Sequence, residues 1–134
     1  MSSKISSCGL TVLRIVVGAV FVAHGAQKLF TYHISGVAGM FAHIGIPLPG
    51  ISAAVVTLVE FFGGIALILG VATRLAALAI AIDMTVAILL VHFKNGFFMP
   101  TGYEYALTLL SANICLMLTG AGVYSVDGLF GKKN

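Results

Sequence analysis

The sequence has very few charged residues. Asp, Glu, Lys and Arg make up only 8% of its 134 residues, whereas about 25% is usual in a water-soluble domain. Hydrophobic residues make up 60%, and the mean hydropathy is +1.12. A soluble fold of this composition would expose large apolar patches to water, which monomeric proteins rarely tolerate. The shortage of charge therefore excludes a soluble globule and predicts a protein that is solvated by the lipid bilayer.

Cysteine is also scarce. The two cysteines, Cys8 and Cys115, lie at opposite ends of the sequence and form no C-x-x-C motif, so a dithiol redox site and a zinc site are not supported. Two cysteines cannot hold an iron–sulfur cluster, and no helix carries two inward histidines at haem spacing. No metal site is predicted, and the chain has no motif for haem, flavin or an iron–sulfur cluster.

Basic residues are too few and too scattered to predict a nucleic-acid-binding surface. In a membrane protein, a small basic excess more often records the orientation of the chain. Nucleic acid is therefore not an expected partner.

Four apolar segments are long enough to cross a membrane, for which a helix needs about 20 mostly apolar residues. They cover residues 9–30, 50–70, 73–93 and 103–123. The connection at residues 70–73 is so short that the second and third helices must be antiparallel neighbours. The sequence predicts a single domain over residues 1–134, which is an all-α integral membrane four-helix bundle.

A short fifth helix is predicted between the first and second spans. Apolar residues recur at helical spacing from Val37 to Ile44, and Gly45 and Pro47 end the pattern. This segment is too short to span the membrane, so we expect an interfacial or re-entrant helix.

Four spans place both termini on one side of the membrane. That side holds Lys4, Arg74, Lys132 and Lys133, with Arg14 near the membrane edge, whereas the other side holds Lys28 and Lys94. Basic residues are enriched in cytoplasmic segments. We therefore predict a multi-pass protein of the plasma (inner) membrane with both termini in the cytoplasm.

Several polar residues lie inside the predicted spans, where a charge costs about 2.5 to 3.5 kcal/mol. They are Arg14, His24 and Lys28 on the first helix, Glu60 on the second, Asp83 and His92 on the third, and Glu104 and Asn113 on the fourth. Such residues face the bundle interior and are functional candidates by default. At about 100° per residue, the three on the first helix share one face.

The depth of these residues predicts two layers, since each residue adds about 1.5 Å of rise. Glu60, Asp83 and Asn113 lie near the middle of the membrane, and Arg14 is within reach of Glu60. We predict an Arg14–Glu60 ion pair, because a lone buried ion would be costly. The outer layer consists of His24, Lys28, His92 and Glu104.

Helix geometry separates some of these candidates. Asp83 and His92 are nine residues apart, as are Glu104 and Asn113, so each pair shares a cavity only if its helix bends or ends early. We favour His92 and Glu104 for the outer site, and place Asp83 on a packing surface for another helix or another subunit. Purely structural roles stay open: lysine and arginine can be interfacial anchors, and Asn113 can bond a neighbouring helix.

The chain resembles the DoxX family of small four-helix membrane proteins from Leu13 to Asp127. The resemblance rests on the order and spacing of short motifs: Leu13-Arg14-Ile15, His24-Gly25, Lys28-Leu29-Phe30, Gly45-Ile46-Pro47, Val59-Glu60, Gly63-Gly64, Thr73-Arg74, His92-Phe93, Asn95-Gly96-Phe97-Phe98, Gly102-Tyr103-Glu104-Tyr105-Ala106 and the stretch Gly120-Ala121-Gly122-Val123-Tyr124-Ser125-Val126-Asp127.

The resemblance implies a role near a membrane quinone. Some members of the family resemble membrane subunits of thiosulfate:quinone oxidoreductases, and others are linked to oxidative stress or quinone detoxification. The implied cofactor is a quinone, bound by His24, Lys28, Glu60, His92 and Glu104. Of these, His24 or Lys28 would donate to the quinone carbonyl, and Glu60 or Glu104 would relay the proton. Asp83 does not match a family position.

Three functions remain open from the sequence. The first is a quinone-interacting subunit of a membrane oxidoreductase, with Glu60, His24 and Lys28 as its catalytic residues. The second is a non-catalytic membrane anchor or scaffold for a soluble or membrane redox partner. The third is a small proton-coupled transporter, in which Glu60 would carry the proton and a homo-oligomer would form the pathway.

Overall fold

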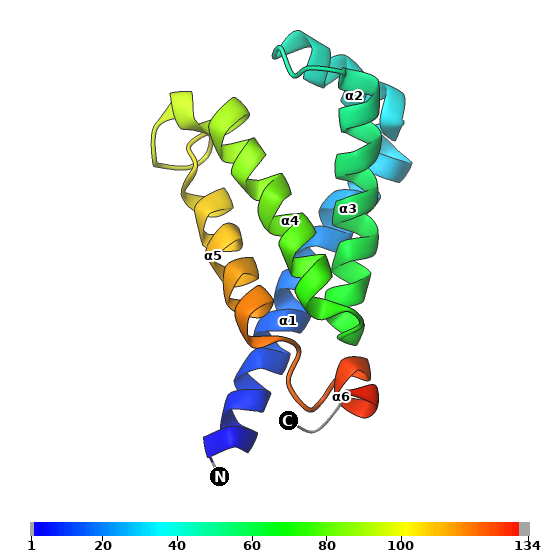
Figure 1. The fold of residues 1–134 in the computed structure, drawn as a ribbon. Helices are drawn as coiled ribbons and strands as arrows, with labels where there is room; N and C mark the ends of the chain where they lie inside the picture. Colours follow the sequence, from blue (N-terminus) through cyan, green and yellow to red (C-terminus); the bar gives the residue numbers. More distant parts are fainter. Residues whose placement is uncertain (1, 132–134) are drawn as a thin grey trace.

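The computed structural model describes residues 2–131, and this part of the chain is helical without any strand. Two helices continue as π-helix, α1 over Gln27–Thr31 and α4 over Ile88–His92, and a short 3₁₀ turn at Phe93–Asn95 follows the latter. Figure 1 shows the six α-helices: α1 (Ser2–Ala26), α2 (His33–His43), α3 (Pro49–Leu69), α4 (Thr73–Ala87), α5 (Glu104–Thr119) and α6 (Val126–Phe130).

The chain is an all-α membrane bundle, as predicted. Three continuous helical stretches are long and apolar enough to cross a membrane, namely Ser3–Thr31, Pro49–Leu69 and Thr73–Asn95. The fourth predicted span is a shorter apolar helix, α5, which ends at Thr119 because Gly120 adopts a positive φ of 78°. Its 16 residues extend about 24 Å, somewhat less than the roughly 30 Å hydrocarbon core of a bilayer.

The predicted short helix between the first two spans is α2. It has 11 residues, packs against α3 and lies at the end of the bundle that is remote from α6 (Figure 1). The start of α1 and helix α6 lie at the opposite end, so the chain enters and leaves on one side. Lys132 and Lys133, which contribute to the orientation prediction, lie outside the described residues.

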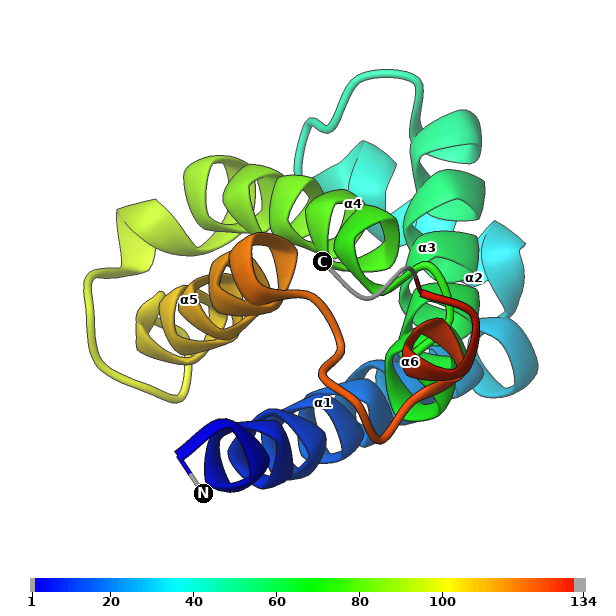
Figure 2. The ribbon, with the colours of Figure 1, turned by 60° about the horizontal axis from the view of Figure 1, so that its bottom comes forward.

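The helices form two pairs. Helix α1 packs mainly on α3, and α4 packs mainly on α5, as both ribbon views show (Figures 1 and 2). The pairs meet near the α3–α4 turn and diverge toward the end that carries α2 (Figure 1). Residues of both pairs line a cavity between them.

Glycines set the distance between α1 and α3. A Cβ atom on Gly64 would lie 2.7 Å from the carbonyl oxygen of Gly18, and one on Gly25 would lie 2.5 Å from the backbone nitrogen of Phe61. Lipid gives little hydrophobic drive for helix association, so close backbone packing of this kind is what holds membrane helices together. This contact fixes the first and third helices as one unit.

The C-terminal stretch closes the end of the bundle. Arg14 is buried and donates hydrogen bonds to the carbonyl oxygens of Ala121, at 2.6 Å, and Tyr124, at 2.9 Å. The Asp127 carboxylate accepts from the backbone N–H groups of Ala72, at 2.8 Å, and Thr73, at 2.9 Å. These hydrogen bonds connect α1 and the start of α4 to the segment of residues 121–127.

The predicted Arg14–Glu60 ion pair is wrong. The guanidinium of Arg14 satisfies its charge on backbone carbonyls at the α6 end of the bundle, whereas Glu60 pairs with Lys28 nearer the other end. The estimated depth of Arg14 in the membrane placed it within reach of the Glu60 carboxylate. In the folded protein, Arg14 instead binds carbonyl oxygens of the 120–125 loop, which lie outside any helix.

We expect Asp127→Ala to destabilise the protein by about 1 kcal/mol, because it removes the cap from the first N–H groups of α4. Burial alone would raise the pKa of Asp127, but the hydrogen bonds from Thr73 and Ala72 and the charge of Arg14 outweigh it and hold this pKa below its usual value.

A carboxylate whose pKa is lowered by folding stabilises the protein above its unfolded pKa, which is about 4. This stabilisation is lost as the pH falls through the lower folded value. Thermal unfolding in detergent should therefore show the Asp127→Ala deficit at neutral pH and a smaller one in acid. A deficit that is equal at both pH values would show that the charge of Asp127 does not matter.

Candidate functional site

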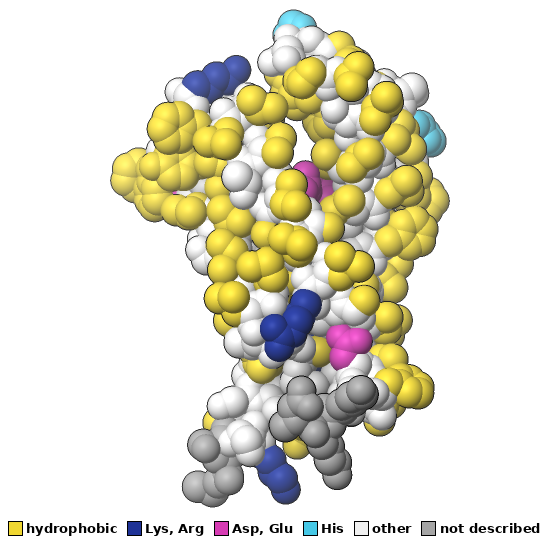
Figure 3. All heavy atoms as spheres, viewed as in Figure 1, with side chains coloured by type: hydrophobic (Ala, Val, Ile, Leu, Met, Phe, Trp, Pro, Cys, Tyr) yellow, Lys and Arg dark blue, Asp and Glu magenta, His cyan; other side chains and the backbone are white. Residues whose placement is uncertain are grey.

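A cavity of about 580 Å³ lies between the two helix pairs. Helices α1 to α5 all contribute to it, together with the link between α2 and α3, and most of its walls are apolar. In the space-filling view, an acidic side chain is visible at the bottom of a hollow between α3 and α4 (Figure 3). The cavity therefore combines apolar walls with ionisable groups in its interior.

An ion pair lies on one wall of this cavity. The Lys28 ammonium, from the π-helical extension of α1, is 2.6 Å from Oε2 of Glu60 on α3. The Glu60 side chain is only 6% exposed and that of Lys28 is 19% exposed. Both residues were predicted for the site, and the structure places them in direct contact.

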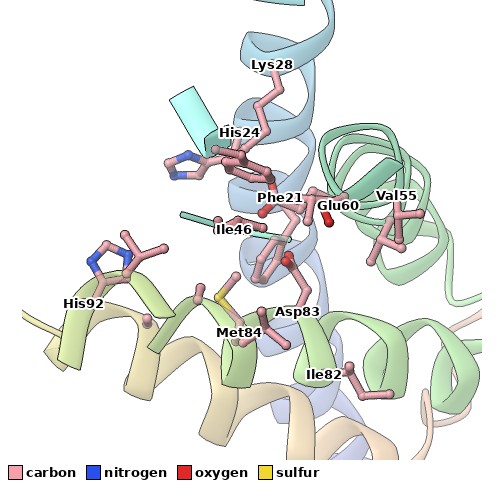
Figure 4. A pocket seen from close by; sticks show the side chains of 18 of the residues that line it. Phe21, His24, Lys28, Ile46, Val55, Glu60, Ile82, Asp83, Met84 and His92 are labelled. Carbon is pink, nitrogen blue, oxygen red and sulfur yellow. The ribbon is translucent and has the colours of Figure 1, made fainter. Parts of the chain in front are cut away.

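Asp83 also lines the cavity, although it was predicted to lie on a packing surface. Its side chain extends from α4 into the space where Glu60 lies (Figure 4). Oδ2 of Asp83 is buried and has no hydrogen-bond partner among the described residues. Asp83 was a candidate because a charge inside the bilayer is costly. It was left out of the predicted site only because it was assigned to the opposite face of its helix from His92.

The π-helix of α4 explains why Asp83 and His92 can both line the cavity. On an ideal α-helix, nine residues give a separation of about 180°. The segment Ile88–His92 is π-helical, which inserts about one residue per turn and reduces the angle to about 80°. Asp83 and His92 were expected to share a cavity only if their helix departs from regular α-helical geometry, and the π-helical segment is such a departure.

Two histidines and a tyrosine also contribute to the polar part of the lining. His24 lies on α1, with its ring centroid 6.4 Å from that of Tyr105 on α5. Nδ1 of His92 lies 3.3 Å from the carbonyl oxygen of Thr101. His24 and His92 are thus at the cavity as predicted, whereas no pattern in the sequence had singled out Tyr105.

Glu104 and Asn113 do not line the cavity. Oε1 of Glu104 accepts the backbone N–H of Met99, at 3.1 Å, at the start of α5. Asn113 is buried and donates to the carbonyl oxygen of Leu109 in its own helix, at 2.8 Å. The position of Glu104 therefore does not support the prediction that it binds the ligand. Its hydrogen bond to Met99 instead stabilises the 96–104 loop.

Most of the apolar lining was not predicted from the sequence. Phe21 and Met84 are buried beside the ionisable groups, and Met40, Phe41 and Ile46 come from α2 and the segment that follows it. Apolar residues are so common in this chain that their pattern alone cannot distinguish a cavity wall from a lipid-facing surface.

The arrangement suits an amphipathic ligand with a flat polar head. Lys28 has three N–H donors, and its contact with Glu60 leaves others for an acceptor on a ligand. Exposed apolar residues, Ile51 and Val55 on α3 and Ile82 and Val86 on α4, line the side of the cavity that faces the bilayer. An apolar tail on the ligand could therefore pass between α3 and α4 into lipid.

The model of the DoxX family matches residues 9–93. The chain is 33% identical to "Putative oxidoreductase CatD" of Bacillus subtilis, over 98% of this chain and 96% of that protein. It is also 33% identical to "Inner membrane protein YqjF" of Escherichia coli, over 97% of this chain and 98% of that protein. No solved structure gives a significant match.

Proposed function

Because this chain belongs to the DoxX family of membrane proteins, we propose that its cavity binds the headgroup of a membrane quinone. The protein would then act as the quinone-interacting subunit of a membrane oxidoreductase system, with a soluble or membrane redox partner. The name of the Bacillus subtilis relative supports an oxidoreductase role. The observation that carries the proposal is the Lys28–Glu60 ion pair inside an otherwise apolar cavity.

The chemistry of the cavity fits both the apolar ring faces and the polar carbonyl groups of a quinone. A quinone ring is flat and apolar on its faces, and the walls near the ion pair include Phe21 and Met84. Its carbonyl oxygens accept hydrogen bonds, which Lys28 and His24 can donate. Glu60 holds the Lys28 ammonium in place, so the donor is oriented before the ligand arrives.

The position of the cavity fits a ligand that is dissolved in the membrane. We propose that the quinone enters from the bilayer between α3 and α4, where Val55 is 54% exposed and Ile82 is 57% exposed. We also propose that the membrane is the plasma (inner) membrane with both termini cytoplasmic. The basic residues of the sequence and the name of the Escherichia coli relative support this.

The proposal is tested by measuring quinone binding directly. We expect the protein in lipid nanodiscs to bind tritium-labelled decylubiquinone saturably, whereas empty nanodiscs take it up only in proportion to concentration. Organic extraction of the freshly purified protein should also release a bound quinone. If neither is observed but a redox enzyme co-purifies, the protein is instead an anchor for that enzyme.

A bulky substitution at the bilayer-facing side should block entry. We expect Val55→Trp to lower the affinity for decylubiquinone at least about tenfold, because the indole would occupy the space between α3 and α4. Leu58→Trp is the matched control, since Leu58 lies on the same helix, is 44% exposed and does not line the cavity. Equal affinities of the two variants would contradict entry at this position.

A further inference from the structure

Asp83 differs from the other acidic side chains of this protein. The chain has four Asp and Glu residues. Glu60 pairs with Lys28, Asp127 accepts two backbone N–H groups at the start of α4, and Glu104 accepts the N–H of Met99. Within residues 2–131, Asp83 is the acidic residue whose buried oxygen accepts no hydrogen bond from a protein donor. The Glu60 carboxylate lies beside it, and these two groups can share a hydrogen bond only if one of them is protonated.

The charges around Asp83 do not balance if its carboxyl group is ionised. The groups that face it across the cavity are Lys28 and His24 from the first helix, Glu60 from α3, His92 from the end of α4 and Tyr105 from α5. Lys28 is already in contact with Glu60 at 2.6 Å. One ammonium cannot neutralise two carboxylates, and an uncompensated carboxylate in an apolar interior is costly.

We propose that Asp83 is the proton-binding group of this cavity: it carries a proton when the cavity is empty and donates a hydrogen bond to a carbonyl oxygen of the bound headgroup. The second half of this statement rests on the proposed quinone function, whereas the first half does not. Lys28 and Asp83 would then provide two donors from different helices, and Glu60 would keep the first of them oriented.

The position of Asp83 supports this role over simple packing. Its carboxyl group points into the same space as that of Glu60 (Figure 4), and the neighbouring Met84 is buried against the core. Of the buried side-chain atoms without a hydrogen-bond partner among the described residues, the Asp83 oxygen is the one that belongs to a cavity-lining residue. Such a group calls for an explanation, and a protonated carboxyl group that serves a ligand in the cavity provides one.

Infrared spectroscopy of the empty protein tests the first half of the proposal. We expect a C=O stretching band of a protonated carboxyl group at neutral pH, which disappears in Asp83→Asn and persists in Glu104→Gln. The assignment is simple because the chain has only four acidic side chains. A wild-type protein without this band, or an Asp83→Asn variant that retains it, would overturn the proposal whether or not the protein binds quinone.

Quinone binding tests the second half. Asp83→Leu should weaken decylubiquinone binding about tenfold, as expected for the loss of one hydrogen bond inside a protein. Asp83→Asn keeps a donor, so its affinity at neutral pH should stay within about threefold of that of the wild type.

The pH dependence separates a proton-binding group from a neutral donor. Affinity of the wild type should fall as the pH rises, because ionised Asp83 is no longer a donor, whereas affinity of Asp83→Asn should fall less. Identical pH profiles, or wild-type affinity in Asp83→Leu, would refute the role of Asp83 in binding. A wild type that binds no quinone would refute the proposed function, and the infrared measurement would still decide the protonation of Asp83.

Discussion

Lys28→Met is expected to abolish measurable quinone binding and to destabilise the protein by about 3 to 5 kcal/mol. The substitution removes a hydrogen-bond donor from the cavity and leaves the Glu60 carboxylate buried without its partner at 2.6 Å. Breaking one half of a buried ion pair is costly because the remaining charge cannot return to water. Thermal unfolding in nanodiscs measures the stability, and the decylubiquinone titration measures the binding.

The double variant Lys28→Met/Glu60→Gln separates these two effects. Replacing both partners removes the uncompensated charge, and such replacements are often close to neutral for stability. We therefore expect the double variant to recover most of the stability but none of the binding. If the double variant binds quinone as the wild type does, the ion pair is a structural feature and the proposed function loses the observation that carries it.

Gly64→Ala should have the next largest effect, on both stability and binding. The added Cβ would lie 2.7 Å from the carbonyl oxygen of Gly18 and 2.7 Å from the backbone nitrogen of Val22. Backbone atoms cannot move aside as a side chain can, so α1 and α3 would have to separate, at a cost of about 1 to 3 kcal/mol. Glu60 lies one helical turn before Gly64, so the geometry of the ion pair would change as well.

Gly9→Ala is the matched control for this prediction. Gly9 lies on α1 like Gly18, and a Cβ at this position would meet nothing within 4 Å. We expect no loss of stability and no change in quinone affinity for this variant. If Gly64→Ala unfolds at the same temperature as Gly9→Ala, the close contact of α1 and α3 is not what holds these helices together.

Composition and hydropathy were enough to predict the fold class, because lipid imposes few solutions on a chain that is 60% hydrophobic. The short α2 helix was also found, since its apolar spacing ends at Gly45 and Pro47. The fourth span was predicted too long: the apolar run continues past residue 119, and only the backbone conformation of Gly120 ends the helix there.

The site was predicted less well than the fold. The rule that buried charges mark function found Lys28, Glu60, His24 and His92, which line one cavity, and also Asp83. The predicted ion pair of Arg14 with Glu60 was wrong. A sequence does not show that a loop near the other end of the chain supplies carbonyl oxygens to Arg14.

Helix periodicity misled the assignment of Asp83. The assumption of a constant rotation per residue placed Asp83 and His92 on opposite faces, but α4 changes to π-helix over Ile88–His92. Nothing in the apolar sequence Ile88-Leu89-Leu90-Val91 signals this change. An argument from helical faces therefore holds only within one regular segment, and two of the helices that form this cavity are irregular at its edge.

Photoaffinity labelling would show where a quinone binds on this protein. A photoreactive azidoquinone can be bound to the protein in nanodiscs and illuminated, and the labelled peptides can be identified by mass spectrometry. We expect labels on cavity residues such as Phe21, Met84 and Tyr105, and we expect excess decylubiquinone to prevent them. Labels spread over lipid-facing residues such as Leu58 and Leu75, and unchanged by the competitor, would show that no quinone site exists between the two helix pairs.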